Sequence, residues 1–242
     1  MDTPDQNPVE KTPKARPPKK KTSQPQVILS LPEKLFILAI DDDQGAVAAS
    51  VKNKLRYGLT GAILSELAIM GKIVTEEGCI QAADPSPTGD FLCDHALALI
   101  VAMKKPHKMG RVVNDLAKEP LFKQTAERLA ERNIITIEKK KFAWISPSVV
   151  YPQVDGSTKY WMKAKLRAII LAGEKPEAQD IALFSLLTAC QLLRLVFTSD
   201  ERSAAQKQVD ALVLGEAYGE ALANLLTDID RAAGEAVEDQ IT

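Results

Sequence analysis

Aromatic residues are scarce in this 242-residue sequence: they make up 5% of the chain, whereas hydrophobic residues make up 45%. Leu, Ile, Val and Ala must therefore fill the core, which suits helices. Cysteine is also rare, and Cys79, Cys93 and Cys190 lie far apart without forming a Cys-x-x-Cys pair. This spacing is typical of buried thiols in a reducing compartment. The N-terminus lacks the apolar segment of a secretory signal, so we expect a cytoplasmic protein.

The sequence also lacks an excess of charge of one sign. Its 31 Lys and Arg residues nearly balance its 32 Asp and Glu residues, which leaves a net charge of −1. A dedicated nucleic-acid binder usually carries a strong basic field, so we expect no nucleic-acid partner. Any attraction to anions must come from local basic patches.

Recognisable catalytic and metal-binding motifs are missing as well. The sequence has no glycine-rich phosphate loop and no serine in a Gly-x-Ser-x-Gly turn, and its two histidines, His95 and His107, lie twelve residues apart. The stretch DDDQG begins like a calcium loop, but its twelfth position is Lys52 instead of glutamate, which favours a solvated acidic turn. We therefore expect a protein that is not an enzyme and has no catalytic residue, cofactor or metal.

Residues 1–26 differ from the rest in composition. They contain six prolines and no aromatic residue, and six Lys or Arg residues outnumber three Asp or Glu residues. Such a segment cannot bury enough apolar surface to offset its ordering entropy, which predicts a disordered basic tail. The tail either aids solubility or adds weak attraction to anionic lipid or an acidic partner. We predict a folded domain at 27–235 and a flexible C-terminus at 236–242.

Helical periods dominate the predicted domain. We expect a helix that opens near Pro32, one that ends near Gly71, and C-terminal helices at 158–173, 176–198 and 200–232. The sequence indicates a mainly α fold with small β-hairpins, in one domain or two small ones.

The apolar run 181–197 is nearly long enough to span a bilayer, but it contains Gln191 and Arg194. An arginine inside a span is costly, so the run favours the central buried helix of a bundle.

The segment 134–146 predicts one of the hairpins, because apolar and polar residues alternate on both sides of a lysine turn. Beyond the lysines, Phe142 and Trp144 share one strand face and Ile145 lies on the other. Three interpretations stay open. Trp144 packs inward beside a solvated lysine turn, or the hairpin meets a membrane, or it joins two subunits.

A winged-helix DNA-binding domain is a further alternative, because the helix at 60–70 is followed by a strand, a turn and a second strand. A recognition helix would carry Arg, Lys, Asn or Gln side chains that reach base edges. This helix instead carries Thr60, Ser65 and Glu66 and no basic residue, which indicates a packing element.

Four blocks carry a family resemblance, and they occur in the order LSLPEKLFILAIDDDQG, GLTGAILSELAIMGKI, DPSPTGDFLCDHAL and ERLAERNIITIEKKKFAWI. They resemble the blocks of the Golgi phosphoprotein 3 family over roughly residues 28–235. The resemblance implies a mainly α fold, a single globular helical domain around a buried central helix, with small β-hairpins. It also implies a peripheral membrane protein that binds phosphatidylinositol 4-phosphate and acts as an adaptor for the cytosolic tails of membrane enzymes, on the cytosolic face of the Golgi in eukaryotes.

The resemblance also implies site residues. A hairpin that inserts into the bilayer matches Lys139, Lys140, Lys141, Phe142, Trp144 and Ile145. The family's lipid pocket is only partly retained: Thr60 stands in place of an arginine, Ala126 in place of the basic partner of Lys123, and the tryptophan position falls on Ser50 or Val51. Nearby basic residues would offer substitute charge, so the candidate headgroup residues are Lys123, Lys52, Lys54, Arg56 and Thr60.

From these observations we expect a peripheral module that recognises an anionic phospholipid membrane, by resemblance a phosphoinositide, and the cytosolic tails of membrane proteins. The second alternative is a protein–protein adaptor, or a homo-oligomer formed through the 134–146 hairpin, without phosphoinositide specificity. The winged-helix DNA binder is the third.

Overall fold

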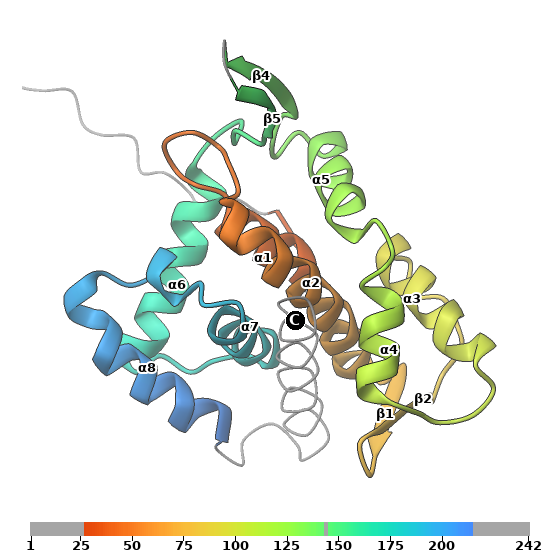
Figure 1. Ribbon diagram of the computed structural model, residues 1–242. Helices are drawn as coiled ribbons and strands as arrows, with labels where there is room; N and C mark the ends of the chain where they lie inside the picture. The colour runs from red at the N-terminus through yellow and green to blue at the C-terminus, as the bar shows by residue number, and fades with distance from the viewer. Residues whose placement is uncertain (1–26, 143–144, 215–242) are drawn as a thin grey trace, which may run out of the picture.

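Helices form most of the molecule, and small antiparallel sheets connect them (Figure 1). The computed structural model describes residues 27–142 and 145–214. The helices are α1 (Leu31–Ala39), α2 (Ala49–Ile69), α3 (Phe91–Ala102), α4 (Met109–Leu116), α5 (Leu121–Glu131), α6 (Ser157–Ala172), α7 (Ala178–Ala189) and α8 (Ser199–Leu214), with a short 3-10 helix at Leu193–Leu195. The strands are β1 (Ile73–Glu76), β2 (Cys79–Ala82), β3 (His107–Lys108), β4 (Glu138–Phe142) and β5 (Ile145–Val150). The predicted mainly α fold with small hairpins is confirmed, whereas the predicted tail 1–26 and C-terminus 236–242 lie outside the described residues.

Helix α1 is buried along almost its whole length. It opens as predicted near Pro32, and the backbone N–H of Ser30 donates to Glu33 Oε2 over 2.9 Å. Eight of its nine residues are buried. A helix that is apolar on nearly all sides is stable only inside a core.

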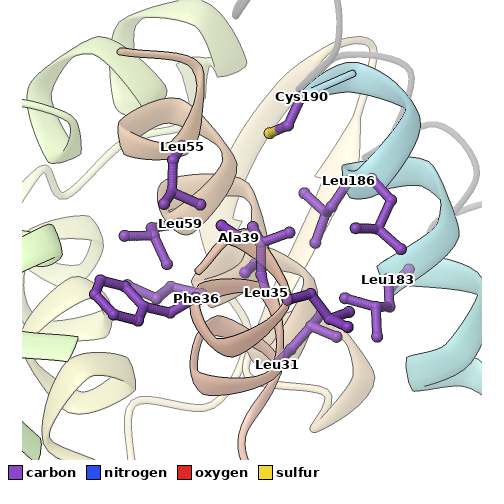
Figure 2. Packing of buried hydrophobic residues seen from close by; sticks show 14 of the residues in the cluster. Leu31, Leu35, Phe36, Ala39, Leu55, Leu59, Leu183, Leu186 and Cys190 are labelled. Atoms are coloured by element: carbon purple, nitrogen blue, oxygen red, sulfur yellow. The ribbon is translucent and has the colours of Figure 1, made fainter. Parts of the chain in front are cut away.

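The core forms where α1, α2 and α7 contact one another. Figure 2 shows Leu35 of α1 directed toward Leu183 of α7, while Phe36 lies on the opposite side of α1. Leu35 is fully buried, and burial of such a side chain stabilises the fold by about 2 kcal/mol. Helix α2 also contacts α3, α4 and α5, so it is the helix around which the others are arranged.

The burial of α2 argues against the winged-helix alternative. Every residue from Thr60 to Leu67 is buried, so this stretch has no face that would enter a DNA groove. The helix is a packing element, as its lack of basic residues predicted.

The predicted central helix at 181–197 is too long. Helix α7 ends at Ala189, and Gln191 has a left-handed φ of 58°, which stops the helix. The break leaves Gln191 and Arg194 exposed while Val196 and Phe197 remain buried. The two polar residues that argued against a membrane span are therefore the ones that the turn brings to the surface.

Strands β1 and β2 form the strand, turn and second strand that were predicted after the helix at 60–70, and Glu77 and Gly78 form the turn. Both residues have positive φ, 50° and 71°, and they lie between the paired residues Glu76 and Cys79. A two-residue loop with left-handed backbone matches the twist of an antiparallel pair. Strand β3 adds a short third strand to this sheet.

The second hairpin corrects a prediction, because the lysine run does not form its turn. Lys139 pairs with Val149 and Lys140 with Ser148, so both lie within β4, and the pairing continues to Phe142 opposite Ile145. Figure 1 shows β4 and β5 at one end of the molecule, beyond the helices and next to α5. The hairpin projects from the helical domain.

Candidate membrane-binding surface

An aromatic cluster fixes the base of the β4–β5 hairpin to the helices. Phe36 of α1, Phe122 of α5 and Tyr151, which follows β5, contact one another with ring centroids 4.9 to 5.7 Å apart. Phe36 and Tyr151 are buried. Tilted and edge-on aromatic pairs stabilise beyond the area they bury, so the hairpin has a fixed attachment to the core.

The acidic loop after α1 packs against the same base. The carbonyl of Gly45 accepts a hydrogen bond from the backbone N–H of Tyr151 over 2.6 Å. Gly45 has a φ of 67°, and a Cβ at this position would lie 2.8 Å from the backbone nitrogen of Pro152. Only glycine fits both the left-handed backbone and the close approach.

Two predicted lysines of the hairpin are exposed. Lys139 and Lys140 are neighbours on β4, so their side chains lie on opposite faces of the strand. Lys141 and Phe142 end β4 and Ile145 begins β5 by their backbones, and Trp144 lies outside the described residues. Insertion of Phe142, Trp144 and Ile145 into a membrane stays a prediction.

Lys123 lies near the hairpin base, in the first turn of α5 beside Phe122. Its side chain is 74% exposed, and its Nζ lies 3.6 Å from Glu127 Oε1, one helical turn further on. An exposed pair of this kind is weak, so the lysine charge remains available to an anion.

The predicted headgroup residues Lys52, Lys54 and Arg56, at the start of α2, do not all lie on one face of the helix. Lys52 and Arg56 are one turn apart and share a face, whereas Lys54 lies on the face of Gly58. That face packs toward α7, because the Cys190 thiol donates to the Lys54 carbonyl over 3.5 Å. Lys52 is exposed and Arg56 is half-buried, so these two are the members of the cluster that could act together.

Arg56 has an unused donor. Its Nη2 donates to the Tyr57 hydroxyl over 3.3 Å, and its guanidinium lies 5.1 Å from the centre of that ring. Its Nε is buried and has no hydrogen-bond partner within the described part of the chain. Thr60 does not join this site: it is fully buried, and its hydroxyl donates to the Arg56 carbonyl over 3.2 Å. Its place at a lipid headgroup stays a prediction, and its burial argues against it.

A buried ionic network, which the sequence did not reveal, joins blocks far apart in the chain. Arg128 donates to Glu33 Oε1 over 3.0 Å, and its Nη2 lies 2.8 Å from Asp90 Oδ2. Arg132 contacts both oxygens of Glu33 at 2.6 and 2.8 Å and donates to the carbonyl of Ile28 over 2.6 Å. Glu33 is fully buried, so the two arginines are committed to compensating its charge.

A second buried carboxylate extends this arrangement to α2 and α7. Glu66 accepts a hydrogen bond from the backbone N–H of Leu31 over 3.0 Å and from the Gln179 side chain over 2.8 Å. Burial raises the pKa of Glu66, and these hydrogen bonds and nearby Lys34 oppose the rise. The four blocks that carry the family resemblance each supply a member of these networks, so they specify the fold more directly than the surface.

Two lysines of α6 hold the acidic loop. Lys159 is buried, donates to the carbonyl of Ile40, and lies 2.5 Å from Asp42, which also lies 2.7 Å from Lys163. Partial burial raises the pKa of Asp42, but the hydrogen bonds from the two lysines outweigh this and lower it. The sequence offered no signal for this cluster, because its members are separated by more than one hundred residues.

The described residues contain no helix long and apolar enough to cross a membrane. The same residues contain no group of His, Cys, Asp or Glu side chains that would hold a metal ion.

Comparison with known proteins confirms the predicted resemblance. A family model described as Golgi phosphoprotein 3 (GPP34) matches residues 31–236. Vacuolar protein sorting-associated protein 74 of Eremothecium gossypii is 26% identical over 190 residues, which are 69% of this chain and 56% of that protein. The chain therefore spans a little over half the length of this relative.

Proposed function

Because the chain belongs to the Golgi phosphoprotein 3 family, we propose that it is a non-enzymatic peripheral membrane module that binds anionic phospholipid. The observation that carries the proposal is the projecting hairpin with exposed Lys139 and Lys140 on a base fixed by aromatic contacts. The fixed attachment keeps the hairpin at one end of the molecule (Figure 1), so the charges on its two faces are both available to an anionic surface.

Electrostatic attraction supplies the first part of the binding free energy. A lysine near an anionic membrane is worth about 1 kcal/mol. Lys139 and Lys140 on the hairpin and Lys123 beside its base would each contribute. Insertion of Phe142, Trp144 and Ile145 at the headgroup boundary would supply the second part, because two modest signals together give stable residence.

Headgroup recognition depends on fewer residues than the resemblance implies. By resemblance the ligand is phosphatidylinositol 4-phosphate, whose phosphate needs charge-assisted hydrogen bonds. Arg56 supports such a contact, because it has a buried N–H without an acceptor among the described residues, and Lys52 lies on the same helix face. The burial of Thr60 argues against a contact there.

The proposed adaptor role is supported by family membership and not by a single contact. We propose that the module, once on the membrane, holds the cytosolic tails of membrane proteins, on the cytosolic face of the Golgi if the cell is eukaryotic. The name of the Eremothecium gossypii relative refers to vacuolar protein sorting, which supports a role at a membrane.

Self-association through the 134–146 hairpin is a second candidate. Strands β4 and β5 pair only with each other in the described part of the chain, which leaves an unpaired edge on each. Such edges are templates for pairing with another chain.

Co-sedimentation with liposomes separates the two candidates. Recovery of the protein should rise with phosphatidylinositol 4-phosphate content and fall in the Trp144→Ala variant. A variant with both Lys139→Gln and Lys140→Gln should bind about 30-fold more weakly, at about 1 kcal/mol per lysine. Lys207→Gln, an exposed lysine of α8, is the matched control. Equal recovery with neutral and anionic vesicles would favour the self-association candidate instead.

A further inference from the structure

A cavity of about 590 Å³ lies beside the base of the β4–β5 hairpin. Its walls come from the loop at 41–45, the base of the hairpin and the first turns of α6. The volume falls within the range of about 300 to 1,000 Å³ that is typical of ligand sites. None of the candidate headgroup residues on α2 and α5 lines it, so it is a separate site.

The charge of the cavity selects against a phosphoinositide. Its lining contains four carboxylates and three lysines, a formal excess of one negative charge. Two of the lysines, Lys159 and Lys163, are committed to Asp42. A phosphate monoester with a charge near −2 would meet the remaining carboxylates. A zwitterion with a cationic end suits the lining better.

Lys140 offers a contact for a phosphate. It lines the cavity from the hairpin side, and it forms no ion pair with any described residue. A lysine binds a phosphate oxygen with a charge-assisted hydrogen bond. A phosphodiester, with a single negative charge, needs only one such partner.

The remaining lining suits an ammonium group. The carboxylates of Asp43 and Glu138 line the cavity, and so does Tyr160, which is 65% exposed and attracts cations over the face of its ring. Gln153 also lines the cavity, and its Oε1 is buried without a hydrogen-bond partner within the described ranges. A buried acceptor of this kind is costly until a donor reaches it. A primary ammonium has three N–H donors, whereas a quaternary ammonium has none.

We propose that this cavity binds the phosphoethanolamine headgroup of a zwitterionic phospholipid. Lys140 binds the phosphate, and Gln153, Asp43 and the Tyr160 ring bind the ammonium. The inference rests on the proposed function, because the hairpin would bring the cavity to the membrane surface. The module would then recognise two chemistries: anionic lipid through its lysines and a neutral lipid through this cavity.

Soluble phosphoethanolamine tests the cavity without a membrane. Saturation-transfer NMR on the full chain should detect phosphoethanolamine, with a clearly weaker signal for phosphocholine, and inorganic phosphate should displace phosphoethanolamine only weakly. Lys140→Gln should weaken binding about tenfold through loss of one charge-assisted bond, whereas Lys139→Gln, its neighbour outside the cavity, should not. Tyr160→Ala should also weaken it, with Leu171→Ala on the same helix as the matched exposed control.

Vesicles then test the lipid itself. At a fixed content of phosphatidylinositol 4-phosphate, replacing phosphatidylcholine with phosphatidylethanolamine should increase recovery of the wild type but not of Lys140→Gln. Failure of all vesicle binding with intact phosphoethanolamine binding would overturn the proposed function and leave the cavity assignment standing. Equal binding of phosphocholine, equal effects of Lys139→Gln and Lys140→Gln, or binding of free arginine in place of phosphoethanolamine would overturn the cavity assignment. The last result would identify a site for a basic peptide.

Discussion

Replacement of Arg128 by methionine should lower the free energy of unfolding by about 2 to 4 kcal/mol. Arg128 contacts fully buried Glu33 at 3.0 Å and Asp90 at 2.8 Å. Removal of one member of a buried ion pair costs about 3 to 5 kcal/mol, because the partner is left as an uncompensated charge. The loss here is smaller, because Arg132 still contacts Glu33 at 2.6 Å. Methionine keeps most of the aliphatic packing, so the charge is the main change.

Urea denaturation followed by far-UV circular dichroism measures this loss. Lys123→Met is the matched control on the same helix, and removal of its exposed pair with Glu127 should change stability by no more than about 0.5 kcal/mol. A double-mutant cycle with Asp90→Asn should give a coupling free energy of about 1 to 2 kcal/mol. If Arg128→Met were as stable as the control, the network would not hold the fold together, and the structural role assigned to the four blocks would be wrong.

Three further substitutions test other parts of the structure by thermal or urea unfolding. Gly45→Ala should lower the free energy of unfolding by about 2 kcal/mol or more, since strain at positive φ adds to a clash with the hairpin base. Gly173→Ala is the control: Gly173 has a φ of 71° and open space around it, so the loss should be only about 1 kcal/mol. Gly58→Ala should lower the free energy of unfolding by about 1 to 3 kcal/mol, because its Cβ would lie 2.4 Å from the Cys190 sulfur. Addition of Cys190→Ala to this variant should restore part of that stability. If it restores none, the contact with Cys190 is not the source of the strain. The pKa of Glu66 is raised on folding, so this group favours the native state below its ordinary pKa and loses that contribution as pH rises through the folded pKa. Glu66→Gln should therefore gain stability relative to the wild type as pH rises above about 4, the ordinary pKa of a glutamate, and a difference that does not change with pH would contradict the assignment.

Local signals in the sequence predicted much of the fold. Pro32 sets the first turn of α1, and Glu77 with Gly78 forms the turn between β1 and β2, because the backbone preferences of these segments are decided within a few residues. The lysine run at 139–141 is the exception. Lysine has no special preference for turns, and long aliphatic stems are tolerated in an exposed strand, so β4 continues through the run to Phe142.

The arrangement of the site could not be predicted in the same way. Lys52, Lys54 and Arg56 are close in sequence, yet Lys54 lies on another face of α2, and only the fold shows that this face packs against Cys190. Thr60 is a candidate headgroup residue by resemblance, yet the packing of α2 buries it. These outcomes depend on contacts between segments far apart in the chain, and hydrophobic periodicity carries no information about such contacts.

The aromatic contacts among Phe36, Phe122 and Tyr151 have a mechanical consequence. A force on the hairpin is transmitted through these ring contacts to helix α1, most of which is buried. Partial unfolding around α1 would free the base of the hairpin. Binding of the hairpin to a membrane would in turn oppose this unfolding. Changes that raise the membrane affinity of this protein should therefore also raise its thermal stability.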